Sequence, residues 1–177
     1  MKKIIFILIL VAVIASISYL AFGLDSTETY VTDNKIEENH PAQQTQQTVK
    51  LYYYNPELDE DEEGNILCSD QGLVAVDREI PVTQTPIQDT IKLLIRGELT
   101  ASEVAQGIET EYPLENFALE GANLENGVLT LEFNDPNLST VGGSCRTGIL
   151  AFQVIETAKQ FEGVESVEFT PEELFQP

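Results

Sequence analysis

The acidic stretch at residues 59–70 has the residue types and the spacing that could bind a calcium ion. It places carboxylates at the first, third, fifth and twelfth positions and a glycine at the sixth, as calcium-binding loops do. The candidate ligands are five oxygen-bearing side chains: Asp59, Asp61, Glu63, Asn65 and Asp70. The stretch departs from the pattern because Leu67 fills the ninth position and because Asp70 is one methylene shorter than the usual glutamate. An acidic surface turn between two strands is the alternative, which these departures favour.

Ser144 and Cys145 are candidate nucleophiles because they lie at the start of an expected helix, within residues 142–146. Amide groups at a helix start can hold an anion and can lower the pKa of a thiol. The single histidine, His40, lies outside the expected globular part, so neither nucleophile has a histidine base there. We therefore expect a serine-capped helix start, with Cys145 engaged in a disulfide.

Four further carboxylates, Glu103, Glu109, Glu111 and Glu115, could include a pair that hydrolyses glycosides. Acidic residues are so frequent in this chain that their presence alone identifies no pair. The tyrosine run at residues 52–54 could stack against sugars, but alternation along a strand turns one or two of its rings inward. The sequence therefore favours a core strand over a sugar site, and it predicts no catalytic residue.

Residues 1–24 are predicted to form a membrane anchor. The run at residues 4–24 has no charged side chain and, as a helix, would cross roughly 30 Å, the thickness of a bilayer core. A cleaved signal peptide is the alternative, but bulky Leu20 and Phe22 lie where signal peptidase prefers small residues. Lys2 and Lys3 on the short flank predict a cytoplasmic N-terminus, so the rest of the chain would face outward at the cell membrane.

The charge of the chain restricts its partners. A formal net charge of -21 disfavours binding to nucleic acid and to anionic lipid headgroups, and it attracts divalent cations and basic partners. Residues 25–48 are polar and lack apolar periodicity, which predicts a disordered linker. In an exported chain, two cysteines are expected to pair, so we predict a Cys68–Cys145 disulfide.

Residues 49–177 are predicted to form one globular domain. Strands are expected at residues 50–54, 73–81 and 164–169, and the Asn126-Gly127 turn predicts a hairpin. Helices are expected between Thr85 and Gly97, after Thr100, and at residues 145–161. This order favours an α+β fold with a mixed or antiparallel sheet of about five strands and two main helices on one face.

Several segments in order resemble the GerMN (sporulation and spore germination) domain family. Residues 87–113 read IQDTIKLLIRGELTASEVAQGIETEYP, with a helix end, a threonine-containing turn and a later glycine and proline as in that family. The likeness continues through residues 124–131, 142–144 and 157–161, and covers about residues 49–170. It implies a single copy of a small α/β domain, related to ring-building modules of envelope assemblies and without established catalytic residues.

The sequence as a whole predicts a non-enzymatic, membrane-tethered binding or assembly domain on the extracytoplasmic side of the bacterial cell envelope. An envelope protein or peptidoglycan would be its partner, and self-association into a homo-oligomer is a further expectation. One alternative is a hydrolase that remodels the cell wall with paired carboxylates. Another is a calcium-responsive structural domain centred on residues 59–70. No cofactor other than Ca²⁺ is expected.

Overall fold

The computed structural model describes residues 45–177. The predicted anchor, at residues 1–24, and nearly all of the predicted linker lie outside the described residues. Within residues 45–177, no helix combines the length and the apolar character needed to cross a membrane.

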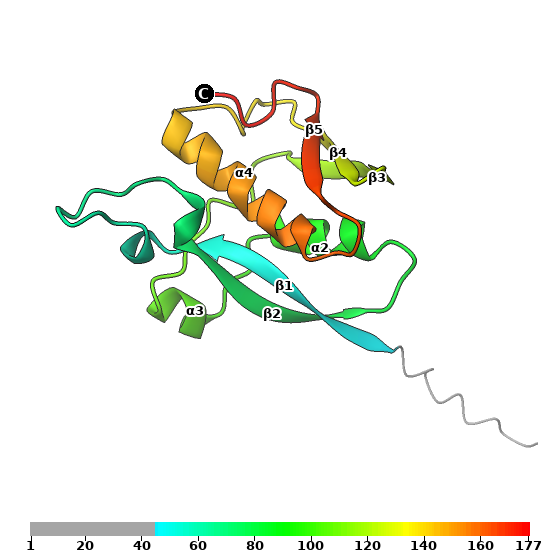
Figure 1. Cartoon of the computed structure of the whole chain (residues 1–177), viewed down its shortest axis with the longest axis horizontal. Coiled ribbons are helices and arrows are strands. Elements are labelled where there is room, and N and C mark those ends of the chain that lie inside the picture. Colours follow the sequence, from blue (N-terminus) through cyan, green and yellow to red (C-terminus); the bar gives the residue numbers. More distant parts are fainter. Residues whose placement is uncertain (1–44) are drawn as a thin grey trace, which may run out of the picture. The chain divides into compact units, whose positions relative to one another are not determined.

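The first two strands form an antiparallel ribbon (Figure 1). Strand β1, Gln46–Tyr54, pairs along its whole length with β2, Leu73–Pro81. Side chains alternate along β1, so Leu51 and Tyr53 are buried on the same face. The aliphatic and aromatic residues of this segment suit a half-buried strand. The strand begins at Gln46, so it takes the last three residues of the predicted linker.

The remaining strands form a separate sheet in the order β3-β4-β5. Strands β3, Ala118–Glu125, and β4, Val128–Asn134, form the predicted antiparallel hairpin, and β5, Ser166–Thr170, pairs with β4 in parallel. Asn126 and Gly127 have φ values of 52° and 85°, which a type I′ turn requires.

Three α-helices lie within residues 45–177 and connect the strands: α2, Pro86–Leu94; α3, Ala101–Ala105; and α4, Ser144–Lys159. Thr100 and Glu103 form the predicted capping box of α3. The predicted serine cap of α4 is wrong, because Gly143 is the N-cap and Ser144 is the first helical residue. Thr85 precedes α2 as predicted, but its side chain makes no capping hydrogen bond.

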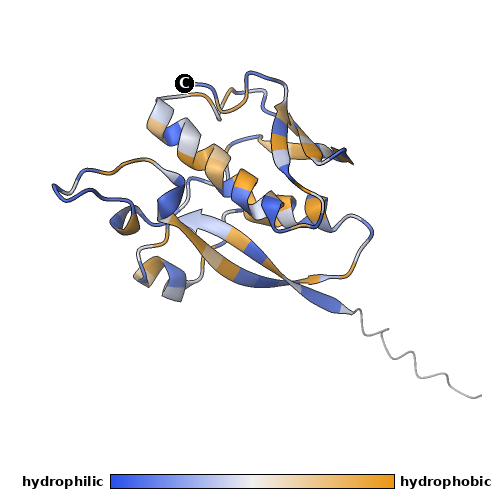
Figure 2. Cartoon of the chain, viewed as in Figure 1, coloured by the Kyte–Doolittle hydropathy of each residue, from blue (hydrophilic) through white to orange (hydrophobic). Residues whose placement is uncertain are grey.

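The predicted α+β fold class and the five strands are confirmed, but the strands divide between two sheets. Helices α2 and α4 contact each other and strands of both sheets. Their apolar side chains meet those of the strands in one core, in which Leu94, Leu129, Leu131 and Val154 are fully buried. Figure 2 shows apolar colours on the middle of α4 and along the strands, whereas the loop that projects between η1, Pro56–Leu58, and η2, Asp70–Gly72, is largely hydrophilic.

Candidate functional site

The predicted calcium ligand Asp59 is the centre of a buried hydrogen-bond network. Its side chain is buried and accepts hydrogen bonds from the Tyr54 hydroxyl at 2.6 Å and from the Ser69 amide at 2.6 Å, and from the Ser69 hydroxyl. Burial opposes ionisation of Asp59, yet these hydrogen bonds outweigh it and hold the pKa of the carboxyl below its usual range. Asp59 thus fastens the two ends of the projecting loop to each other.

The other candidate ligands are distributed along the same loop. Asp61 accepts hydrogen bonds from the amides of Glu63 and Asn65 at 2.9 and 2.8 Å, and from the Asn65 side chain. Asp70 is exposed and begins η2. In the part of the chain that the structure describes, no three His, Cys, Asp or Glu side chains gather in an arrangement that could hold a metal ion. Calcium binding stays a prediction, which calorimetry with millimolar Ca²⁺ would test.

The loop is joined to the start of α4 by a disulfide between Cys68 and Cys145, the pair that the sequence analysis joins. Their Cα atoms are 5.1 Å apart. Next to it, the Arg146 guanidinium donates to the Glu111 carboxylate at 2.6 Å and to the carbonyls of Ser139 and Val141. The segment that contains the candidate nucleophiles therefore links the start of α4 to the acidic loop through a disulfide and to Glu111 through an ion pair.

The four candidate carboxylates separate into different environments. Glu103 pairs with Arg78 through two bonds of 2.7 and 2.8 Å, and this pairing lowers its pKa to about 2. Glu115 is exposed, and its backbone carbonyl accepts a hydrogen bond from Asn137. Only Glu109 and Glu111 share a cavity.

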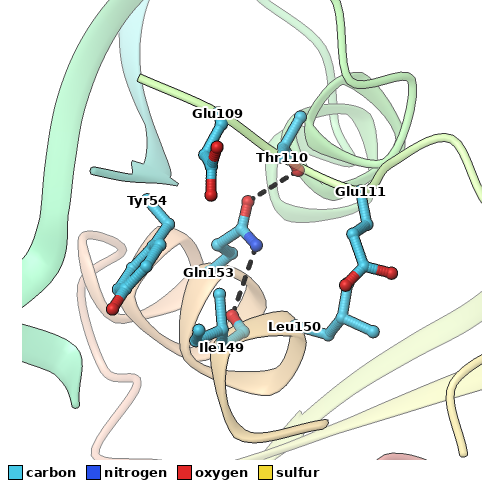
Figure 3. A pocket seen from close by; sticks show the side chains of 7 residues that line it. All are labelled: Tyr54, Glu109, Thr110, Glu111, Ile149, Leu150 and Gln153. Carbon is cyan, nitrogen blue, oxygen red and sulfur yellow. Dashed lines mark hydrogen bonds between the residues drawn. The ribbon is translucent and has the colours of Figure 1, made fainter. Parts of the chain in front are cut away.

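That cavity has a volume of about 200 Å³ and lies between residues 109–111 and α4 (Figure 3). Gln153, fully buried, forms its floor: its carbonyl accepts from the Thr110 hydroxyl at 2.8 Å, and its amide donates to the Ile149 carbonyl at 3.3 Å. Figure 3 shows the side chain of Glu109 directed toward Gln153 and that of Glu111 directed toward Leu150. The Arg146 ion pair holds Glu111, so the two carboxylates do not form an equivalent pair.

One edge of the β1–β2 ribbon is closed by groups of the same chain. The Lys50 amide and carbonyl bond to the Gln160 side chain at 2.8 and 2.7 Å, and the Tyr52 amide donates to the Thr157 hydroxyl at 3.0 Å. At the end of β1, Tyr54 exchanges two backbone hydrogen bonds with Glu109. The edge of β1 is thus covered along half its length.

The opposite edge, that of β2, is open in the sense that no strand covers it within residues 45–177, although the Arg78 guanidinium donates to the Asp77 carbonyl and to the Glu98 carbonyl. The backbone amides of Lys50, Tyr52 and Tyr54 bond to partners on the side away from β2. Each of these residues therefore occupies a non-hydrogen-bonded position of the antiparallel ladder. Their partners on β2 include Asp77 and Ala75, whose amides and carbonyls therefore point outward as well. Within residues 45–177, no other strand pairs with this side of β2.

Sequence reasoning missed the contacts that join distant segments. Gln160 and Thr157 were assigned to a helix end without a role, and the C-terminal tail was not placed in the core, although Leu174 and Phe175 are buried. Phe175, an aromatic residue near the C-terminus, is the feature of the sequence that could have indicated that the tail is buried. No local pattern in the sequence indicates that the side chain of Gln160 bonds to the backbone of Lys50, more than a hundred residues earlier.

Comparison with known proteins finds a family match and two similar solved structures. Residues 50–173 match the Germane family, described as sporulation and spore germination. No curated protein matches the chain. The structure of the tandem GerMN domains of the sporulation protein GerM from Bacillus subtilis is 20% identical with a TM-score of 0.51, over 74% of this chain and 42% of that one. The first GerMN domain of the same protein is 14% identical with a TM-score of 0.47, over 70% of this chain and 80% of that one.

The likeness to the tandem structure shows that the two proteins share a fold. The chain covers less than half of the length of that structure. At this level of identity, the site residues described above cannot be transferred from one protein to the other, so their roles must be argued from their own contacts.

Proposed function

We propose, because this chain belongs to the sporulation and spore germination (GerMN) family, that it is a non-enzymatic binding and assembly domain of the cell envelope. Its partner would be an envelope protein or peptidoglycan. Residues 4–24 would anchor the chain in the cell membrane, and the globular domain would lie on the extracytoplasmic side.

The open edge of β2 carries this proposal. Exposed strand edges present unpaired amides and carbonyls, and proteins with such edges bind extended partners by adding a strand. Thr157 of α4 and Gln160, which follows that helix, close the edge of β1, so the ribbon has one long side left for a partner. A tether to the membrane would keep that side near other envelope proteins.

Site-specific crosslinking in living cells tests the proposed function. A photo-crosslinking amino acid would replace Ala75, which is exposed on β2, and, as the matched control, Lys159, which is exposed on α4. We expect a specific envelope adduct from position 75 and a much weaker one from position 159. Equal background labelling at both positions would overturn a binding role for this edge.

A wall hydrolase is the second candidate, because Glu109 and Glu111 line one cavity. Under this alternative, incubation of the whole protein with purified cell wall releases soluble fragments, and Glu109→Gln abolishes the release. Under the binding proposal, neither the native protein nor the variant releases fragments.

A further inference from the structure

A groove of about 360 Å³ lies beside the end of β2, where that strand faces α2. One wall consists of the last residues of β2, Glu79, Ile80 and Pro81, with Thr83 just beyond them. The other consists of Asp89, Lys92 and Leu93 from α2 and of Arg96, which lies in the turn after that helix. The groove therefore combines a strand edge with a helix face that carries both charged and apolar side chains.

The strand wall of this groove has unused backbone groups. Glu79 pairs with Thr48 in the same set of non-hydrogen-bonded positions as Asp77 and Ala75, so its amide and carbonyl point away from β1. The Asp77 carbonyl already accepts from Arg78 at 3.0 Å. The amides of Ala75, Asp77 and Glu79 have no other strand beside them in residues 45–177. They could bond to the carbonyls of an added strand.

The helix wall carries the two basic side chains of the described residues that lack an ion pair. Six lysines and arginines lie within residues 45–177. Four of them form salt bridges: Lys50, Arg78, Arg146 and Lys159. The other two, Lys92 and Arg96, line the groove together and are one helical turn apart.

Placing two like charges four residues apart at the end of a helix costs stability. Asp89, one turn before Lys92, also lines the groove, but its carboxylate accepts hydrogen bonds from the hydroxyls of Thr83 and Thr85, and within residues 45–177 no ion pair joins it to either base. It is all the less expected in a chain with 30 acidic and 9 basic residues, where carboxylates are abundant. Such a pair provides a local site for an anionic group on an acidic domain.

We propose that this groove binds an extended segment of a partner protein, which pairs with the open edge of β2 and directs a carboxylate side chain to Lys92 and Arg96. The inference rests on the proposed binding function and names its contact surface and partner class. Side chains of an added strand alternate between faces, so neighbours of the carboxylate would point toward Glu79 on the outer face. Basic residues on that face of the partner segment suit it, because within residues 45–177 the Glu79 side chain has the Thr48 hydroxyl as its one partner.

A second copy of this chain fits the edge poorly. Pairing of β2 with itself would bring Asp77 and Glu79 of one copy beside the same residues of the other, and like charges on adjacent strands are destabilising. The net charge of -21 on each copy adds a long-range repulsion. The charges therefore favour a different protein as the occupant.

The probe for this proposal is a fluorescent synthetic peptide, acetyl-Lys-Val-Thr-Asp-Thr-Val-Lys-amide, titrated with the full chain in a mild detergent. Anisotropy should rise and saturate, and affinity should fall with added salt because the contact is ionic. Two altered peptides separate the interactions: one has asparagine in place of aspartate, and the other has N-methylated threonines that cannot donate to β2. Both should bind about tenfold more weakly. Equal binding of all three peptides, or of none, would overturn the proposal.

Variants of the protein test the two walls separately. The double variant Lys92→Gln and Arg96→Gln should weaken binding by about tenfold, whereas Lys159→Gln on α4 should leave it unchanged. Asp77→Pro removes an outward amide without removing a ladder bond to β1, and should weaken binding by about fivefold relative to Asp77→Asn. Equal affinities for the double variant and for Lys159→Gln would contradict the assigned anion site.

The cellular experiment distinguishes the two levels of the proposal. If crosslinking from position 75 captures an envelope protein equally well with and without Lys92→Gln and Arg96→Gln, the binding function stands and the groove is the wrong contact surface. If position 75 captures nothing above the control, the function itself fails. If crosslinking instead yields a dimer of this chain, the charge argument against a second copy is wrong.

Discussion

The two sheets of this domain are stabilised in different ways. The sheet β3-β4-β5 has fully buried Leu129 and Leu131 and a cluster of stacked and edge-to-face aromatic rings around Phe133. The β1–β2 ribbon also contributes to the core, but the segments around it are held by a disulfide, by the buried Asp59 carboxylate, by the partly buried Arg78–Glu103 ion pair and by side chains that cap a strand edge. Apolar packing depends little on pH or redox conditions, whereas these polar and covalent contacts depend on both.

This difference suggests a division of labour. The three-stranded sheet provides a rigid core, and the ribbon presents the open edge and the groove proposed to bind a partner. Removing the contacts around the ribbon should therefore change how the unfolding free energy depends on pH and on reductant. Shortening apolar side chains in the other sheet should lower the unfolding free energy without changing those dependences.

The largest effect is expected from the disulfide. Replacing Cys68 and Cys145 by serine releases a link across 77 residues, which in the chain-entropy model costs about 4 kcal/mol of unfolding free energy. Urea unfolding of the native protein with and without reductant, compared with the double serine variant, measures this loss. A reductant-independent midpoint in the native protein would show that the ribbon does not need the covalent link.

A somewhat smaller loss is expected from Asp59→Asn, because the amide cannot accept all the hydrogen bonds of the buried carboxylate. We expect a cost of about 3 kcal/mol, and a much smaller loss from Asp61→Asn, a partly exposed change in the same loop. Thermal unfolding of the two variants provides the comparison. Similar losses from both would mean that Asp59 is not the residue that fastens the loop.

The ion pair between Arg78 and Glu103 predicts a pH-dependent contribution to stability. The pKa of Glu103 falls from 4.5 to about 2 on folding, so its stabilisation is complete above about pH 4.5 and is lost as the pH falls toward 2. Glu103→Gln should cost about 2 kcal/mol near neutral pH, and the difference from the native protein should shrink below pH 4. Unfolding curves across this range test the sign, with Glu115→Gln as the exposed control. A difference that grows in acid would contradict the assigned pairing.

The sequence predicts the local elements well because their signals lie within a few residues. The Asn126-Gly127 turn, the Thr100 capping box and the full extent of β2 are all local patterns, and each is found in the structure. The division into two sheets could not be predicted, because it depends on Gln160 and Thr157 occupying the edge of β1. The candidate site could likewise be predicted only in part. The acidic loop is evident from the sequence, but the hydrogen bonds that Asp59 accepts from Tyr54 and Ser69 are not.

The smallest effect tests why the ribbon has one closed edge and one open edge. Gln160→Ala removes two hydrogen bonds to the exposed backbone of Lys50, where water can replace them, so we expect a cost of only about 1 kcal/mol. Hydrogen exchange at the Lys50 amide should accelerate while exchange in β4 stays unchanged, with Lys159→Gln as the neighbouring control. The variant also exposes a second strand edge, so it should self-associate more readily than the native protein. If the Lys50 amide of the variant stays protected and the variant stays monomeric, the covering of β1 depends on the packing of α4 and not on this glutamine.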